Sequence, residues 1–196
     1  MFIDYVSLLL VNMMAGYFLL AGYVYRGLDG RDQTKWVPAF GLVGVVAFVF
    51  GMMMVLTWPL PGPYNSAFGE MSVLLGVTFL GAAVCLARGY SLVIVATYAF
   101  FAGLSAVVLG ISIISLGLTL QPLLSGLGFI LSGLAGVFAA PTLVWLRNNR
   151  SWRALATVVL VIVGFVWGAT VYPEYYMHMK SFKDWVPFAM RGLSPR

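Results

Sequence analysis

Long apolar runs separated by short polar breaks dominate the pattern of the chain. A helix needs about 20 apolar residues to cross a hydrocarbon core ~30 Å thick. Six runs qualify, and they occupy residues 5–25, 36–57, 71–87, 92–114, 123–146 and 154–172. They lack the strict alternation of a barrel strand, as in VLLGVTFLGAAVCLA. Because lipid offers no partner to an unpaired backbone group, we predict a transmembrane helix for each run.

The composition supports the same class of protein. Hydrophobic residues make up 62% of the 196 residues and charged residues only 9%, whereas a soluble domain is roughly half apolar and about a quarter charged. No polar stretch approaches the ~50 residues that a separate soluble domain needs. We therefore expect residues 1–196 to form a single all-α membrane domain, a bundle of six transmembrane helices arranged as three helical hairpins.

The basic residues predict how the bundle is oriented. The second and fourth connections, WPLPGPYNSAFGE and LGLTLQPL, have no Lys or Arg, whereas the first, third and fifth carry Arg26, Arg31, Lys35, Arg88, Arg147, Arg150 and Arg153. Basic connections favour the cytoplasmic side, which places both termini outside. The basic residues of the C-terminal tail conflict mildly with this orientation, because it places them outside. The net charge of +5 is explained by these connections, so we expect the lipid bilayer and not nucleic acid as a partner.

One helix face in the fifth run is lined by small residues. Gly128, Ser132, Gly136 and Ala140 recur every four residues, and small residues let membrane helices approach closely. We expect this stripe to be a helix contact surface, either inside the monomer or between copies. Pro141 follows it and should kink the helix.

Polar residues are scarce inside the predicted spans. No Asp, Glu, Lys, Arg or His lies near the middle of a run, although proton relays and ion-coupled transporters usually need such a residue there. Asn12 is the strongest polar group in the first run. It is predicted to bond another helix, and it is a candidate to line a route for a solute.

The outer face holds the remaining candidate functional residues. The second connection has three prolines in five residues and should be a stiff loop. It contains Tyr64 and Asn65, and Glu70 opens the third span, where a carboxylate complements the helix dipole. The tail, residues 173–196, returns to this side with Glu174 and His178 and is predicted to include a short interfacial helix.

Metal and enzyme chemistry have weak support. Met177, His178 and Met179 offer Cu(I) ligands, but methionine also fills gaps in apolar packing. A single histidine excludes a bis-histidine haem within one chain. The single Cys85 excludes an intramolecular disulfide and a cysteine-based zinc site. No hydrolase or phosphate-binding motif is present, so an enzyme acting alone is disfavoured. We expect no cofactor, with copper or haem as the alternative.

The loop WPLPGPYNSAFGE, with Glu70 at the start of the third span, carries a family resemblance. A six-span chain of about two hundred residues with this loop resembles an uncharacterised prokaryotic integral-membrane family that is catalogued only as a domain of unknown function. The resemblance implies the cytoplasmic membrane of a bacterium or archaeon, and it supplies no activity.

Three functional hypotheses follow from these patterns. The first is a non-enzymatic accessory or structural subunit of a membrane complex, or a homo-oligomer. The second is a channel or permease for a neutral small molecule, with a route past Asn12 and Glu70. The third is metal or haem handling at the outer face by His178 and its neighbouring methionines.

Overall fold

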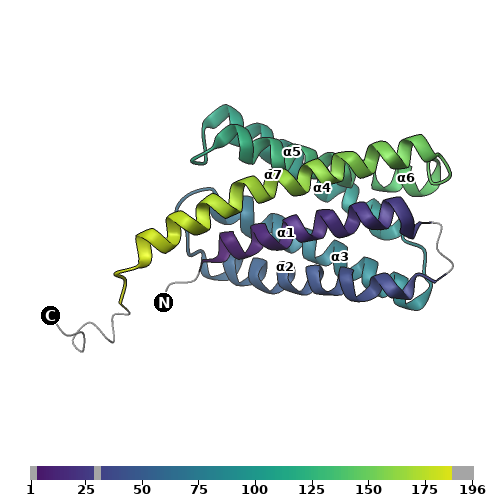
Figure 1. Ribbon diagram of the computed structural model, residues 1–196, viewed down its shortest axis with the longest axis horizontal. Helices are drawn as coiled ribbons and strands as arrows, with labels where there is room; N and C mark the ends of the chain where they lie inside the picture. Colours follow the sequence, from purple (N-terminus) through teal and green to yellow (C-terminus); the bar gives the residue numbers. More distant parts are fainter. Residues whose placement is uncertain (1–3, 29–31, 187–196) are drawn as a thin grey trace.

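The computed structural model describes residues 4–28 and 32–186 of the chain. Every regular element among these residues is helical (Figure 1). The helices are α1 (Tyr5–Gly22), α2 (Val37–Thr57), α3 (Met71–Arg88), α4 (Val93–Leu116), α5 (Pro122–Val137), α6 (Ala139–Val144) and α7 (Arg150–Phe182). Three short turns flank them: π-helical η1 (Tyr23–Gly27) and η3 (Asn65–Glu70), and the 3-10 turn η2 (Thr34–Trp36).

These elements form six membrane-spanning units within the described residues, so the predicted six-helix class is confirmed. The units are Tyr5–Gly27, Thr34–Thr57, Asn65–Arg88, Val93–Leu116, Pro122–Val144 and Arg150–Phe182. Each is long and apolar enough to cross a hydrocarbon core.

The third span begins at Asn65 and not at residue 71, because η3 continues directly into α3. Asn65 is fully buried. Its side-chain oxygen accepts a hydrogen bond from the Leu60 amide at 3.2 Å, and its side-chain nitrogen donates to the Leu60 carbonyl. This pair of bonds ties the proline-rich loop to the start of the helix, so Glu70 lies more than one turn inside the span.

The fifth span is interrupted at Phe138, which separates α5 from α6. A proline ring collides with the carbonyl four residues earlier, here that of Val137, and breaks a helix just before itself. Pro141 therefore acts as expected, but the result is a break and not a kink. The helical part of the span ends at Val144, two residues before the predicted end.

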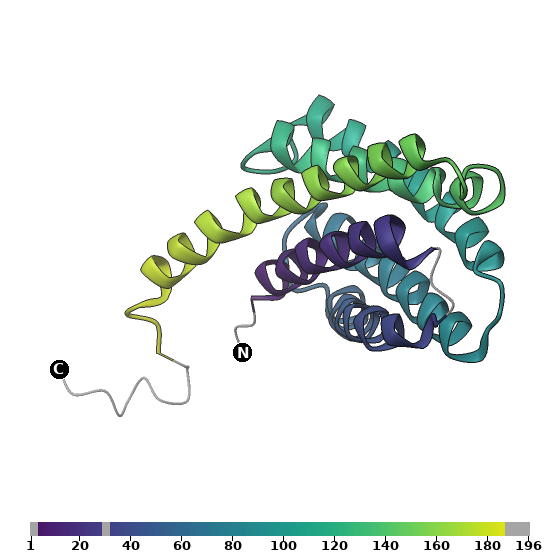
Figure 2. The same ribbon diagram turned by 45° about the vertical axis from the view of Figure 1, so that its right-hand side comes forward.

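The sixth span corrects the prediction of a separate interfacial helix after residue 172. Residues 173–182 continue α7 in spite of Pro173 within it. At 1.5 Å per residue its 33 residues are about 50 Å long, well beyond a ~30 Å hydrocarbon core. α7 passes along α1 and extends past the bundle (Figures 1 and 2). Residues 187–196 of the predicted tail lie outside the described residues.

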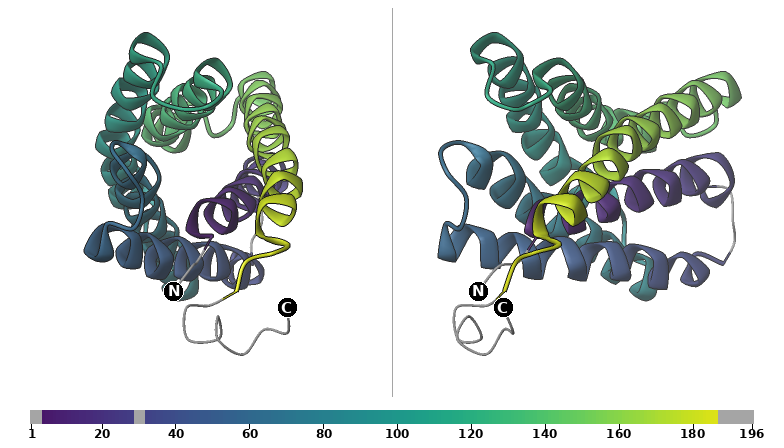
Figure 3. Two further views of the ribbon diagram at one scale, coloured as in Figure 1. Left: turned by 90° about the vertical axis from the view of Figure 1, so that its left-hand side faces the viewer. Right: turned by 60° about the vertical axis from the view of Figure 1, so that its left-hand side comes forward.

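The helices form a ring in which three pairs pack most closely (Figure 3). These pairs are α2 with α3, α4 with α5, and α1 with α7. The three predicted hairpins, which turn on the basic connections, join α1 to α2, α3 to α4 and α5 to α7. None of these is among the three closest pairs. The first two pairs turn on the connections that lack basic residues, and the pairing of the first with the last helix closes the ring.

Glycine backbones make the contact between α4 and α5. A Cβ atom added at Gly133 would lie 2.5 Å from the Gly103 carbonyl oxygen, and one added at Gly110 would lie 2.6 Å from that of Gly126. Both helices therefore space their contacting glycines seven residues apart, the repeat of two helical turns. Such contacts need a residue without a Cβ atom.

Glycines also lie in the contact surfaces of the other two pairs. In α2, a Cβ atom at Gly44 would lie 2.8 Å from the Leu80 amide nitrogen, and one at Gly51 would lie 2.9 Å from that of Val73. In α7, Gly164 lies against the Phe18 ring of α1. Glycine thus sets the separation of α2 from α3, and in α7 it makes room for a side chain of α1.

Two arginines cap the end of the first span. Arg153 is buried, and its Nε and one terminal nitrogen donate to the carbonyls of Val24 at 2.9 Å and Tyr25 at 2.5 Å. Arg147 donates to the Leu28 carbonyl at 2.5 Å. Terminal helix carbonyls lack intrahelical partners and form the negative end of the helix dipole. These arginines therefore bind the first span to the start of the last one.

The glycine contacts give a direct stability test. We expect Gly133→Ala to lower the free energy of unfolding by about 1–3 kcal/mol, because the added methyl group would force α4 and α5 apart. Gly41→Ala is the matched control: its Cβ atom would meet nothing within 4 Å, so helix propensity should stabilise this variant by up to ~1 kcal/mol. Thermal unfolding in detergent, followed by circular dichroism, measures both. Equal effects of the two substitutions would contradict the close backbone contact.

Candidate functional site

A cavity of about 400 Å³ lies inside the ring, and all six spans contribute to its wall. Its lining residues on α1 and α5 begin near mid-helix and continue to the end that carries the basic connections. On α4 and α7, they belong to the half nearest those connections. On these four helices the cavity lies towards the basic connections, whereas on α3 its lining extends from Met71, at the outer end of that helix, to Ala82.

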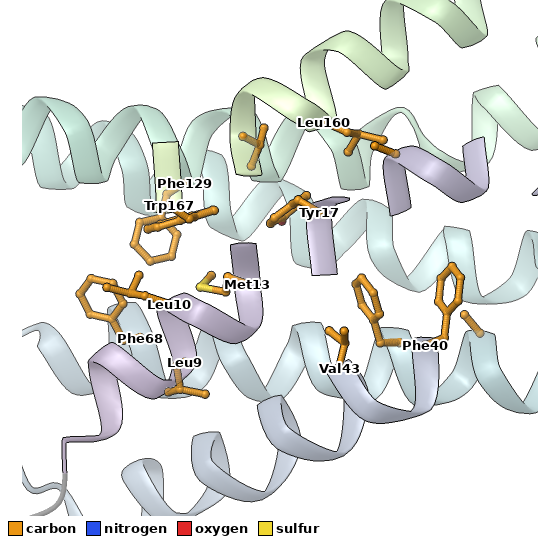
Figure 4. Close-up of a cluster of buried hydrophobic side chains, with 14 of the residues drawn as sticks. Leu9, Leu10, Met13, Tyr17, Phe40, Val43, Phe68, Phe129, Leu160 and Trp167 are labelled. Carbon is orange, nitrogen blue, oxygen red and sulfur yellow. The ribbon is translucent and has the colours of Figure 1, made fainter. Parts of the chain in front are cut away.

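A row of aromatic side chains packs between the cavity and the outer loops. Ring centroids lie 6.2 Å apart for Tyr64 and Phe68, 5.4 Å for Phe68 and Phe129, and 5.2 Å for Phe129 and Trp167. These four residues, which we call the aromatic layer, cross the bundle from η3 through α5 to α7. Figure 4 shows Phe129 and Trp167 together, with Phe68 nearby. Since Phe129 also lines the cavity, the layer closes it towards the outer loops.

A hydroxyl cluster lies at mid-depth in the cavity wall. Trp167 is completely buried, and its indole Nε1 donates to the Ser132 hydroxyl oxygen at 3.1 Å. The Tyr17 side chain lies beside Ser132, near enough for the two hydroxyls to interact. Tyr17 and Ser132 line the cavity, whereas Trp167 lies behind them. The cluster ties α1, α5 and α7 together at this depth.

The remaining polar side chains of the wall bond within the protein. Thr78 donates to the Leu74 carbonyl at 2.8 Å, in its own helix. Tyr23 donates to the Gln33 side-chain oxygen at 3.1 Å.

Two more of these polar side chains lie near the break at Phe138. Thr142 donates to the Phe138 carbonyl at 2.7 Å and accepts from the Trp152 indole at 2.9 Å. No charged side chain lines the cavity, whose lining residues all fall within the described ranges. The wall is therefore mainly apolar, and the protons of Tyr23, Thr78, Thr142 and Trp152 are donated within the protein.

The cavity reaches the membrane-facing surface between α5 and α7. Three of its lining residues are exposed: Leu134 in α5, Phe138 at the helix break and Leu155 in α7. The rings of Phe138 and Trp152 lie 5.6 Å apart beside this opening. The cavity wall thus includes exposed side chains of α5, of the helix break and of α7.

The residues predicted to be functional lie apart from the cavity. Asn12 donates to the Val43 carbonyl at 3.0 Å and thus bonds α1 to α2, the role predicted first for it. Tyr64 belongs to the aromatic layer and Asn65 holds the loop. Glu70 is exposed and accepts a hydrogen bond from the Ser66 hydroxyl at 3.0 Å. None of these four residues lines the cavity.

The small-residue stripe of the fifth span is divided between two partners. Gly128 contacts the Trp167 ring, and Ser132 bonds to its indole. Gly136 instead faces α4, where a Cβ atom would lie 2.6 Å from the Ala99 carbonyl oxygen. Ala140 lies beyond the break, in α6. The first three positions thus make contacts inside one chain.

A second polar cluster joins the outer ends of α1 and α7. The Nδ1 atom of His178 lies 2.6 Å from the Asp4 carboxylate and 3.3 Å from the Ser7 hydroxyl. Glu174 lies one helical turn before His178 and is partly buried. Asp4 also accepts from the Ser7 amide at 3.2 Å and caps α1.

The geometry of this cluster does not activate Ser7 as a nucleophile. A carboxylate can only accept a hydrogen bond, so Nδ1 of His178 carries the proton that it donates to Asp4. Ser7 approaches the same nitrogen, which then cannot act as its base. The cluster is therefore a contact between two helices.

Metal ligands do not converge in the part of the chain that the structure describes. No group of three or more His, Cys, Asp or Glu side chains is arranged there to hold a metal ion. Met177 and Met179, on either side of His178, are both exposed. The candidate outer-face residue His178 contacts Asp4, whereas Glu70 bonds to Ser66 and Asn65 bonds to Leu60.

Sequence reasoning did not single out Tyr17 or Asp4 as site residues. Tyr17 carried a usable signal, because a tyrosine in the middle of a span is far from the interface where that residue is usually found. Asp4 was recognisable as a helix cap, but its bond to His178 spans nearly the whole sequence. Asp4 and His178 meet only because the first and last helices lie side by side in the closed ring.

The chain belongs to a family of unknown function. The family model described as "Protein of unknown function (DUF981)" matches residues 1–181, which confirms the resemblance inferred from the proline-rich loop. Searches of curated proteins and of solved structures found no match.

The contact between Asp4 and His178 gives a testable coupling. We expect a double-mutant cycle with Asp4→Asn and His178→Leu to show a coupling of up to ~1 kcal/mol, because the pair is partly shielded, with side chains 25% and 35% exposed. Lys183 and Asp184 are the control pair, since they are 4.0 Å apart with side chains 71% and 88% exposed, and should show none. Unfolding midpoints in detergent measure both cycles. The contact is refuted if the first cycle also gives zero coupling.

Proposed function

We propose that this protein binds a neutral, mainly apolar small molecule in its central cavity and acts as a permease for it within the membrane. The observation that carries the proposal is a cavity of about 400 Å³ walled by all six spans. Its size falls within the ~300–1,000 Å³ of small-molecule sites, and its wall is apolar with a few polar groups, as such sites usually are.

Shape selects the ligand in such a site. A molecule already dissolved in lipid gains no hydrophobic transfer energy when it enters an apolar cavity. It gains packing contacts, and filling 400 Å³ is worth at most roughly 10 kcal/mol at ~24 cal/mol per Å³. A charged solute would lose its hydration without any compensating charge in the wall. The proposal therefore favours neutral, lipid-soluble molecules.

The route follows from the two ends of the cavity. The aromatic layer blocks passage towards the outer loops, whereas Leu134, Phe138 and Leu155 lie exposed at the lateral opening. The ligand enters from the bilayer between α5 and α7. Release on the outer side requires movement of the aromatic layer, which a permease provides by a conformational change.

Binding of an apolar fluorophore tests the proposal. We expect Ala156→Leu to weaken binding several-fold, because Ala156 lines the cavity and a larger side chain would occupy its volume. Ala169→Leu is the matched control in the same helix, at an exposed position outside the cavity. Titration of each variant in lipid nanodiscs, with protein-free nanodiscs as reference, gives the affinities. Equal binding by both variants would show that the probe does not occupy the cavity.

We also propose that the protein resides in the cytoplasmic membrane of a bacterium or archaeon, with both termini outside. The arginines that cap the first span and the basic connections lie at one end of the bundle, which is the pattern of a cytoplasmic face. We expect a membrane-impermeant thiol reagent to label Leu120→Cys in intact cells and Asn148→Cys only after lysis. Both positions are exposed loop residues, and Cys85→Ala provides the background. The reverse labelling pattern would invert the topology.

An accessory subunit or a homo-oligomer is the second candidate function. The exposed apolar face of α4 favours it, since Ile94, Phe101 and Val108 are each more than 60% exposed and follow one side of the helix. A partner helix could cover this face in place of lipid. Native mass spectrometry from mild detergent is expected to show companion subunits or further copies, and a bare monomer would argue against this candidate.

A further inference from the structure

The donors of the cavity wall show which chemical group the ligand should carry. Tyr23, Thr78, Thr142 and Trp152 each donate their single proton within the protein. Besides Tyr17 and Ser132, no other lining side chain carries an N–H or O–H group. Only this hydroxyl pair can therefore offer a proton to a molecule in the cavity.

A proton count shows that one donor of the pair is left over. Trp167 donates its indole proton to the Ser132 oxygen. Tyr17 and Ser132 hold one hydroxyl proton each, and they lie near enough for one hydroxyl to donate to the other. A bond of this kind uses only one of the two protons. Whichever hydroxyl donates in that bond, the other retains its proton. Within residues 4–28 and 32–186, neither hydroxyl donates to a helix carbonyl, in contrast to the hydroxyls of Thr78 and Thr142.

We propose that the cavity binds an apolar carbonyl compound whose oxygen accepts the hydroxyl proton left over by Tyr17 and Ser132. This inference rests on the proposed function and deepens it by naming the ligand class. A ketone or ester oxygen is an acceptor only, so it satisfies the spare donor without bringing another donor into an apolar space. The rest of the molecule packs against the apolar wall, and the oxygen lies at mid-depth in the membrane.

A pair of matched probes tests the ligand class on the unmodified protein. The first is 6-propionyl-2-dimethylaminonaphthalene, an aromatic ketone whose emission responds to hydrogen bonding at the carbonyl. The second is its 6-propyl analogue, which lacks the oxygen. We expect the ketone to bind roughly three- to tenfold more tightly than the analogue in nanodiscs, which is the range for one added hydrogen bond. Its carbonyl stretch should shift to lower frequency on binding.

Variants then identify the donor. Tyr17→Phe and Ser132→Ala should each keep the preference for the ketone, because each leaves one hydroxyl proton for the ligand. The double variant Tyr17→Phe with Ser132→Ala removes both hydroxyls but frees the Trp167 indole proton. The triple variant that adds Trp167→Phe should therefore lose the preference, since all three donors are gone. Thr78→Val is the control, because it removes a lining hydroxyl whose proton is already donated to its own helix. Circular dichroism checks that each variant remains folded.

The outcomes separate this inference from the proposed function. If neither probe binds the wild-type protein above the lipid reference, the cavity is not a binding site and both proposals fail. If both probes bind equally, the cavity binds apolar molecules but the carbonyl assignment is wrong. If the ketone preference persists in a folded triple variant, this cluster does not supply the donor and the assignment is overturned.

Discussion

Direct contact between glycine backbones is the constraint on which the rest of the structure depends. In lipid, apolar side chains gain little by meeting one another, so helices associate where their backbones approach closely. Gly103 and Gly110 of α4 meet Gly133 and Gly126 of α5, and glycines bring α2 against α3 in the same manner. The two helices of each pair pack closely against each other, whereas neighbouring pairs pack less closely. A ring of such pairs encloses space, and the cavity forms where the aromatic layer does not fill it.

The apolar pattern of the sequence was sufficient to predict the six spans, because the thickness of the hydrocarbon core sets a length that any spanning helix must meet. It was not sufficient to predict which helices pair. The stripe at Gly128 and Ser132 was evident, but the seven-residue spacing of Gly126 and Gly133 was not recognised. Helix ends were also missed where local bonds decide them, as at Asn65, whose side chain bonds to Leu60.

The candidate site depends on contacts that no local pattern contains. Tyr17, Ser132 and Trp167 come from three spans and meet only because α1, α5 and α7 are neighbours in the ring. The outer cluster of Asp4 and His178 likewise needs the first and last helices side by side. The closure of the ring therefore creates both the hydroxyl donor in the cavity and the polar contact at its outer end.

Xenon binding in crystals is the most direct test of the central claim, that three close helix pairs surround an apolar cavity. Xenon enters apolar cavities in proteins without needing a polar partner. Diffraction data from crystals grown in a lipidic phase and pressurised with xenon should show xenon between Tyr17, Ala102 and Ala135, residues that line the cavity from three different spans. An electron-density map in which side chains fill the centre of the bundle, with xenon only at its lipid-facing surface, would contradict the account.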